Sequence, residues 1–208
     1  MCPCNHPERR GIFRTVRPLV LASQSPRRRE LLASLGLSFE VVPARIEEPA
    51  PSGERPEAYV LALARAKARE VAARVGKEKV VLAADTVVYC AGEILGKPGG
   101  PEEARRMLRL LSGRAHQVFT AYVIRAGEET GRVVETRVYF KGLSPAEIEA
   151  YLATAEPWDK AGAYAIQGMA SYMVKRVEGS VTNVIGLPLS EVVEDLLKLE
   201  VIVPESAL

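Results

Sequence analysis

An anion-binding segment is predicted near the start of the chain, where the run Ser23-Gln24-Ser25-Pro26 precedes three successive arginines. A short apolar strand ends just before this run. A helix is expected to begin within it, because Ser25 is a good N-cap and Pro26 suits the first helical position. Helix N-termini favour phosphate, and arginine adds planar donors that stay protonated. The alternative is that Ser25 only caps the helix and that the arginines are solvated.

Two acidic positions could bind a metal ion or activate water. Asp85 follows the apolar run 80–84, and ligand sites of open α/β sheets lie at the carboxyl ends of strands. Its carboxylate could serve as a metal ligand or a base, or could only accept hydrogen bonds from nearby backbone N–H groups. Glu48 lies in a proline-rich loop beside Glu47, where a solvated surface pair is the alternative. Since Mg²⁺ binds to one or two carboxylates plus substrate phosphates, Glu48 and Asp85 would supply the protein's oxygen ligands.

Two lysines are candidates for the same site. Lys67 falls on the apolar stripe of a predicted helix over residues 56–75, so its ammonium group either reaches water along the surface or points into a cleft. Lys97 lies between Gly96 and Pro98 in an irregular segment. It could reach a phosphate oxygen or be an ordinary exposed loop lysine.

Other reactive side chains are not expected to take part in catalysis or metal binding. The N-terminal residues Cys2, Cys4 and His6 resemble the start of a metal site, but no clear fourth ligand is near, so zinc is not expected. His116 directly precedes a predicted strand and is expected to be structural and not catalytic.

The elements that must position these residues alternate between strand and helix. Strands are predicted at residues 19–22, 39–42, 80–84, 87–89, 93–95, 117–125, 132–141, 171–177 and 181–185. Helices are predicted from residue 26 to before Gly36 and at residues 56–75, 101–111, 145–153 and 189–199. This alternation predicts a layered α/β fold, and the hairpin of long strands joined by the turn 127–131 predicts a mixed sheet.

Composition excludes several other classes of protein. The 208 residues are 48% hydrophobic and 26% charged, which suits one compact domain or two closely joined lobes. With 28 basic and 26 acidic residues, the charge of +2 is too balanced for non-specific nucleic-acid binding or a polybasic membrane surface. No run approaches the roughly 18 to 20 apolar residues of a membrane helix. Three cysteines suit a reducing compartment, which predicts a cytoplasmic protein.

Six blocks of sequence, in order, resemble the Maf family of nucleotide pyrophosphatases, and the likeness extends from residue 19 to about 199. The blocks are Leu21-Ala22-Ser23-Gln24-Ser25-Pro26-Arg27-Arg28, Ala84-Asp85-Thr86, Gly96-Lys97-Pro98, Ser112-Gly113-Arg114-Ala115-His116, Asp159-Lys160-Ala161-Gly162-Ala163-Tyr164 with Ile166-Gln167-Gly168, and Asn183-Val184-Ile185-Gly186-Leu187-Pro188-Leu189.

The resemblance implies an elongated mixed sheet flanked by helices, similar to the inosine-triphosphatase-like fold, with a cleft between two lobes. Residues 18–208 would form this single catalytic domain. Residues 1–17 extend beyond the family's usual start and contain no apolar run, so we expect a flexible extension and not a signal peptide. A homodimer and a divalent cofactor, Mg²⁺ or Mn²⁺, are also implied, without a stable nucleic-acid or membrane partner.

The resemblance also assigns roles to residues. Asp85 matches the family's proton acceptor. The positions linked to substrate choice are Arg27, Thr86 and Gln167. The positions linked to phosphate or metal contact are Ser23, Arg28, Glu48, Lys67 and Lys97. The form with Thr86, Ile166 and Gln167 looks like the branch that acts on dTTP and UTP.

The resulting hypothesis is in-line attack of water on the α-phosphorus, with Asp85 as base or as the group that positions the water, and with pyrophosphate as the leaving group. Two alternatives differ from it. In the first, the physiological target is a modified nucleotide and dTTP and UTP are surrogates. In the second, the chain is a non-catalytic nucleotide- or nucleic-acid-binding regulator of cell division, a role suggested by the family's association with septum formation.

Overall fold

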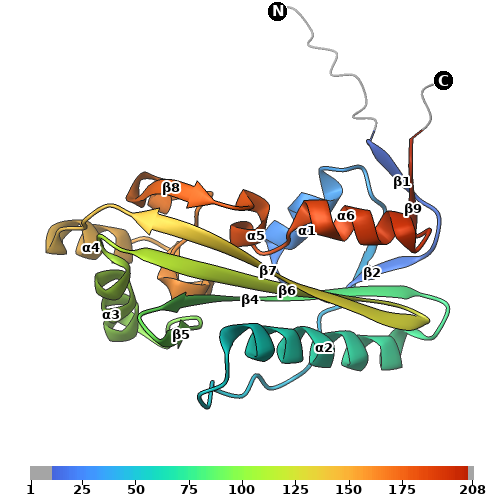
Figure 1. Ribbon diagram of the computed structural model, residues 1–208, viewed down its shortest axis with the longest axis horizontal. Helices are drawn as coiled ribbons and strands as arrows, with labels where there is room; N and C mark the ends of the chain where they lie inside the picture. The colour runs from blue at the N-terminus through green and yellow to red at the C-terminus, as the bar shows by residue number, and fades with distance from the viewer. Residues whose placement is uncertain (1–10, 206–208) are drawn as a thin grey trace, which may run out of the picture.

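The computed structural model of the protein describes residues 11–205 and combines strands with helices, as predicted (Figure 1). The strands are β1 (Phe13–Thr15), β2 (Leu19–Leu21), β3 (Glu40–Val41), β4 (Val80–Cys90), β5 (Glu93–Leu95), β6 (Ala115–Ala126), β7 (Glu128–Phe140), β8 (Val174–Glu178) and β9 (Ile202–Pro204). The helices are α1 (Pro26–Ala33), α2 (Pro56–Val75), α3 (Pro101–Leu111), α4 (Pro145–Leu152), α5 (Val181–Ile185) and α6 (Leu189–Lys198). Short 3₁₀ turns are η1 (Pro157–Asp159), η2 (Ala161–Ala163) and η3 (Met169–Met173).

Seven strands form one mixed sheet in the order β3, β2, β4, β6, β7, β8, with β5 paired to β4. Strand β2 runs parallel to β3 and β4, whereas β4, β6, β7 and β8 are successively antiparallel. The three longest strands, β4, β6 and β7, run along the length of the molecule (Figure 1). The predicted elongated mixed sheet is confirmed.

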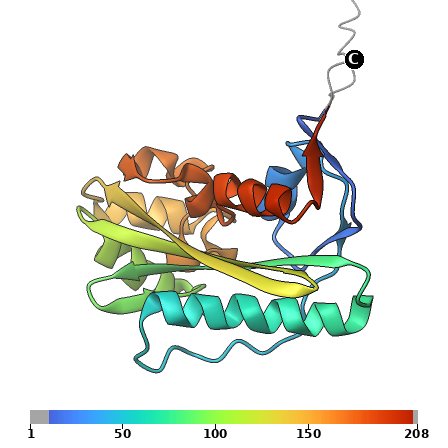
Figure 2. The ribbon, with the colours of Figure 1, turned by 45° about the vertical axis from the view of Figure 1, so that its right-hand side comes forward.

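Helices cover both faces of this sheet, as Figures 1 and 2 show from two directions. Helix α2 packs on one face through Val60, Ala64 and Val71, the stripe that the sequence predicts. Helices α1 and α6 pack on the opposite face through buried residues that include Leu32 and Leu196. The two faces therefore bury separate hydrophobic clusters against the same strands.

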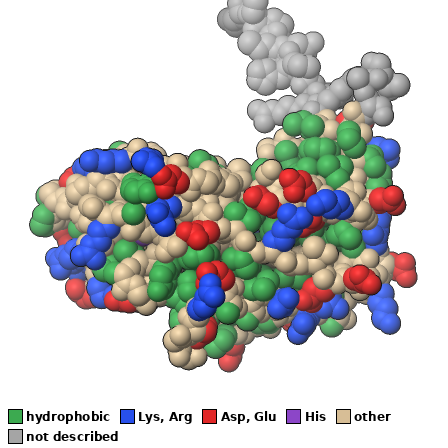
Figure 3. Space-filling view, in the orientation of Figure 1, with side chains coloured by type: hydrophobic (Ala, Val, Ile, Leu, Met, Phe, Trp, Pro, Cys, Tyr) green, Lys and Arg blue, Asp and Glu red, His purple; other side chains and the backbone are tan. Residues whose placement is uncertain are grey.

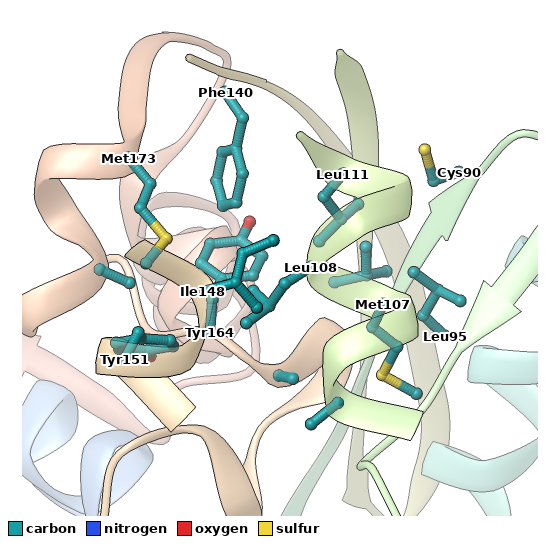
Figure 4. Close-up of a cluster of buried hydrophobic side chains, with 14 of the residues drawn as sticks. Cys90, Leu95, Met107, Leu108, Leu111, Phe140, Ile148, Tyr151, Tyr164 and Met173 are labelled. Atoms are coloured by element: carbon teal, nitrogen blue, oxygen red, sulfur yellow. The ribbon is translucent and has the colours of Figure 1, made fainter. Parts of the chain in front are cut away.

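A third cluster fills the end of the sheet beside α3 and α4 (Figure 4). Met107 and Leu108 of α3 meet Ile148 of α4 there, together with Tyr164 from the segment after η2. Strands β4 and β6 contribute residues to this cluster and to the other two. One continuous sheet therefore joins the region packed around α3 and α4 to the region packed around α1, α2 and α6. Two such regions suit a cleft between two lobes.

Strand β4 is longer than predicted, and this corrects the expected position of Asp85. The prediction placed separate strands at residues 80–84 and 87–89, but both belong to β4, because β6 pairs with it in register from Val81 to Tyr89. Asp85 lies in mid-strand. The parallel neighbour β2 does end here, at Leu21 opposite Leu82, so Asp85 lies beyond the carboxyl end of β2.

The segment 181–185 is helix α5, and the predicted strand is wrong. Its β-branched residues favour a strand in isolation, but the Ser180 hydroxyl caps Asn183 N–H and Gly186 ends the helix at a φ of 123°. Nearby, the predicted strand 171–177 is a 3₁₀ turn, η3, followed by β8. The predicted turn 127–131 narrows to Gly127, since β6 ends at Ala126 and β7 begins at Glu128.

The described part of the predicted N-terminal extension is built into the domain. Strand β1 pairs antiparallel with β9, which joins Phe13 to Pro204 and Thr15 to Ile202. Residues 11–17 therefore differ from the flexible extension expected there, because a strand late in the chain supplies the partner. Cys2, Cys4 and His6 lie outside the described residues.

The described surface agrees with the balanced composition. Acidic and basic side chains are interspersed over the face shown in Figure 3. Within residues 11–205, no helix has both the length and the apolar character needed to cross a membrane.

His116 lies in the core, as expected of a structural histidine. It is 2% exposed, its Nε2 lies 2.8 Å from the Tyr164 hydroxyl, and its ring packs edge-on against Phe140. Burial lowers the pKa of His116 from 6.5 to about 4. The unfolded chain therefore takes up this proton first, and the stability associated with neutral His116 is lost as the pH falls below 6.5.

We expect His116→Gln, which keeps a hydrogen-bonding side chain, to reduce acid sensitivity. Between pH 7 and pH 5 the wild type should lose about 2 kcal/mol of unfolding free energy through this group, and the variant should not. Urea unfolding of both proteins at the two pH values measures the difference. Equal losses in both proteins would show that other groups cause the acid sensitivity.

Candidate functional site

A cavity of about 470 Å³ opens where α1, α2, β4, α5 and the segment after η1 converge. Every site residue predicted from the sequence lines it: Ser23, Arg27, Arg28, Glu48, Lys67, Asp85, Thr86, Lys97 and Gln167. These residues come from segments spread over 145 positions of the chain, since the first is Ser23 and the last is Gln167. The fold therefore brings the predicted residues to one place.

Two carboxylates and one ammonium group lie together in the site, the buried Asp85, the exposed Glu48 and Lys67 between them. The Lys67 ammonium lies 2.7 Å from Glu48 Oε1 and also pairs with Asp85 Oδ1. Asp85 is 7% exposed, because it projects from a central strand under α2. Burial raises the pKa of Asp85 above its ordinary value of 3.8, and the positive charges of Lys67 and Arg28 only partly oppose this. A buried carboxylate with a raised pKa is a candidate base.

Glu48 has the opposite electrostatic balance. Burial acts to raise the pKa of Glu48, but the hydrogen bond and charge of Lys67, with the charges of Lys97 and Arg28, hold it below its ordinary value of 4.5. Glu48 is therefore an anion at neutral pH. Glu48 and Asp85 both line the cavity, and two carboxylates fit a hard divalent cation that also binds substrate phosphates.

Arg28 is held by four hydrogen bonds that join three elements. Its Nε donates to the Gly186 carbonyl at 2.7 Å, and its terminal nitrogens donate to Ala84 O at 2.8 Å, Thr86 Oγ1 at 3.0 Å and Ser23 Oγ at 3.2 Å. A guanidinium has five N–H donors, so most of its capacity is used within the protein. Arg28 thus fixes α1 against β4 and the end of α5.

A chain of hydroxyls, buried beyond Thr86, extends from this guanidinium into the sheet. Thr86 Oγ1 lies 2.9 Å from Thr120 Oγ1, which donates to the Asn183 carbonyl at 2.9 Å. Asn183 Nδ2 in turn donates to Thr136 Oγ1 at 3.0 Å. Thr86 is therefore fixed from two sides, and its hydroxyl is committed to neighbours within the protein.

The remaining predicted residues line the cavity from three segments. Arg27 lies 3.4 Å from Asp159 of η1, so this ion pair spans the cavity between α1 and the late loop. Lys97 and Gln167 are both exposed, Lys97 after β5 and Gln167 between η2 and η3. Side chains at these positions can contact a bound molecule without losing buried partners.

Comparison with known proteins identifies the family. The sequence model of the family described as Maf-like protein matches residues 18–199. The chain belongs to the Maf family. The resemblance of its six sequence blocks is thereby confirmed. The matched range contains every residue that lines the cavity.

Named relatives of this Maf chain cover most of its length. The dTTP/UTP pyrophosphatase of Geotalea uraniireducens (strain Rf4) is 53% identical over 184 residues, which cover 87% of this chain and 94% of the relative. The dTTP/UTP pyrophosphatase of Geobacter sulfurreducens is 55% identical over 185 residues, which cover 87% of this chain and 96% of the relative. Among solved structures, the Ham1 protein of Staphylococcus aureus is similar with a TM-score of 0.48 and 14% identity, covering 88% of this chain and 100% of that chain.

Two features of the Maf site were not predicted from the sequence. Tyr59 lines the cavity, and its hydroxyl donates to the Pro49 carbonyl at 2.8 Å, next to Glu48. Its spacing of eight residues from Lys67 places both on one face of α2 and could have indicated this position. The hydrogen bond from Thr120 to the Asn183 carbonyl could not be predicted from residue spacing, because it joins positions 63 residues apart.

Proposed function

We propose that this protein hydrolyses dTTP and UTP to the monophosphate and pyrophosphate in the cavity lined by Asp85 and Glu48. The observation that carries this proposal is that two carboxylates, those of the buried Asp85 and the exposed Glu48, line one cavity together with basic side chains. These basic side chains include Arg27, Arg28 and Lys97. Basic side chains suit a triphosphate, and the carboxylates suit water activation and a cation. The names of the relatives support the two pyrimidine substrates.

Asp85 is the proposed base. Asp85 lines the cavity, and the pKa raised by burial makes its carboxylate a stronger proton acceptor than an exposed aspartate. It would take the proton of the water molecule that attacks the α-phosphorus. The bond from the α-phosphorus to the bridging oxygen then breaks, and pyrophosphate leaves with that oxygen.

The basic residues would bind and orient the triphosphate. Arg27 of α1, Lys67 of α2 and Lys97 after β5 all line the cavity. A divalent cation, Mg²⁺ or Mn²⁺, would be held by Glu48 and Asp85 and would neutralise charge on the phosphates. Ser23 and Arg28 would shape the phosphate-binding end, since the hydrogen bond from Arg28 to Ser23 Oγ joins the two side chains.

Selectivity is proposed to depend on Gln167 and Thr86. The Gln167 amide both donates and accepts hydrogen bonds, which suits the imide edge shared by uracil and thymine. Thr86 would act through Arg28, because its hydroxyl already accepts from that guanidinium. A homodimer and a cytoplasmic location stay predictions.

Pyrophosphate release from dTTP, UTP, CTP, ATP, GTP and 7-methyl-GTP, with Mg²⁺ or Mn²⁺, tests this proposal. We expect the highest kcat/KM values for dTTP and UTP. Preference for a purine would contradict the proposed substrate class. Absence of metal-dependent release from every nucleotide would favour a non-catalytic protein, and a much higher kcat/KM for a modified pyrimidine would favour the removal of modified nucleotides.

Tyr59→Phe should raise the Mg²⁺ concentration needed for half-maximal activity by about 2- to 10-fold, because one hydrogen bond that holds the loop beside Glu48 is lost. At saturating Mg²⁺, kcat should stay near the wild-type value. Initial rates across a Mg²⁺ series measure both quantities. Tyr172→Phe removes an exposed hydroxyl elsewhere and is the matched control. A fall in kcat without a shift in the Mg²⁺ requirement would contradict this role.

A further inference from the structure

The Lys67 ammonium occupies the position between the two carboxylates. Its side chain is only 12% exposed, and it contacts Glu48 from the loop and Asp85 from β4. Both carboxylates therefore already have a cationic partner within the protein. A divalent cation that binds both of them must compete with this ammonium group.

The charge around this position also opposes a cation that enters alone. Five basic side chains, Arg27, Arg28, Lys67, Lys97 and Lys160, line the cavity with three carboxylates, Glu48, Asp85 and Asp159. Within residues 11–205, no group of three or more His, Cys, Asp or Glu side chains could hold a metal ion. The positive excess suits a polyanion, whereas a free divalent cation meets net repulsion and few ligands.

The loop that carries Glu48 is held independently of Lys67. It lies along α2 and is attached on both sides of Glu48. On one side, the Tyr59 hydroxyl donates to Pro49 O at 2.8 Å. On the other, Arg74 donates to Pro43 O at 2.6 Å and Glu70 accepts from Arg45 N–H at 3.0 Å.

These contacts hold the loop in place, whereas the Lys67 ammonium group is free to change partners. Tyr59, Lys67, Glu70 and Arg74 lie on one face of α2, and only Lys67 bridges the loop to Asp85. The Lys67 side chain can move without release of the loop, because lysine has a flexible four-carbon stem.

We infer that Lys67 is an internal counter-cation for Asp85 and Glu48, so that a divalent cation binds this site only together with a nucleoside triphosphate. The phosphates take over the Lys67 ammonium, and the two carboxylates become available to the cation. The true substrate is then the complex of metal ion and nucleotide. This inference rests on the proposed function, because it assumes that these carboxylates hold the metal.

Mn²⁺ binding measured by electron paramagnetic resonance tests the inference without turnover. We expect the wild-type protein to bind Mn²⁺ alone only weakly, with a Kd of about 1 mM or higher. The hydrolysis-resistant analogue α,β-imido-dTTP should increase the affinity of the protein for Mn²⁺ by about tenfold or more, beyond binding of Mn²⁺ to the free analogue. By reciprocity, Mn²⁺ should increase the affinity for the analogue by the same factor.

Lys67→Met removes the competing ammonium group and should increase the affinity for Mn²⁺ alone by about tenfold. Lys77→Met removes an equal charge from an exposed position and should bind Mn²⁺ like the wild type. Tight Mn²⁺ binding by the wild type without the analogue would overturn the inference. So would unchanged Mn²⁺ affinity in a Lys67→Met protein that melts cooperatively, and the wild-type titrations decide the question if this variant does not fold.

Glu48→Gln separates this inference from the proposed function. If Glu48 holds the metal, this variant should lose most of the Mn²⁺ affinity that the analogue confers. Retention of that affinity would show that the metal lies elsewhere, which contradicts the proposed site. Loss of affinity in Glu48→Gln with tight binding of Mn²⁺ alone to the wild type would overturn only the role of Lys67.

Discussion

Asp85→Asn is expected to lower kcat for dTTP by on the order of 100-fold or more, because it removes the base and one cation ligand at the same time. KM should change much less, since the basic side chains that bind the triphosphate stay in place. The matched measurement is steady-state kinetics at saturating Mg²⁺. A variant that keeps wild-type kcat would show that Asp85 is not the base.

Stability measurements separate this chemical role from a structural one. Burial raises the pKa of Asp85 above 3.8, so the unfolded chain loses this proton before the folded protein does. The stability contributed by the group is therefore present below pH 3.8 and is lost as the pH rises through the folded-state pKa. Asp85→Asn should be at least as stable as the wild type in urea at pH 7. A marked loss of stability would assign Asp85 a structural role instead.

Arg28→Lys is expected to have the second large effect, on both stability and catalysis. Lysine has one compact ammonium group in place of a planar fork, so it cannot reach Ala84 O, Thr86 Oγ1 and Gly186 O together. Loss of these buried bonds should cost about 3 kcal/mol of unfolding free energy. It should also lower kcat/KM for dTTP by about 100-fold, because the strand that carries Asp85 is no longer fixed to α1.

Arg29→Lys is the control for this prediction, since Arg29 is the exposed neighbour in the same arginine run. It should resemble the wild type in urea unfolding and in kcat/KM. If Arg28→Lys and Arg29→Lys behaved alike, the hydrogen bonds of Arg28 would not contribute to the site.

The sequence predicts the elements whose signals are local. Helix α4 is clear because Ser144 and Glu147 form a capping box, and α2 is clear because its apolar stripe is long. The errors arise where tertiary contacts decide. Helix α5 has strand-like residues but a helical cap. Strand β1 has no local partner, since it pairs with a strand almost 190 residues later in the chain.

The sequence predicts which residues line the site but not which of them pair with one another. The type and spacing of Asp85, Glu48 and Lys67, together with the family resemblance, selected residues that line one cavity. Sequence could not show that Lys67 pairs with both carboxylates, because this depends on where the loop lies along α2. Nor could it show that most donors of Arg28 bind groups within the protein.

Hydrolysis of dTTP in H₂¹⁸O, with Mg²⁺ and analysis of the products by mass spectrometry, tests the central claim most directly. Attack of water on the α-phosphorus predicts one ¹⁸O atom in dTMP from a single turnover and none in pyrophosphate. Label in pyrophosphate would place the attack on the β-phosphorus, and formation of dTDP with inorganic phosphate would place the cleavage at the terminal phosphate. Either result would contradict the proposed reaction.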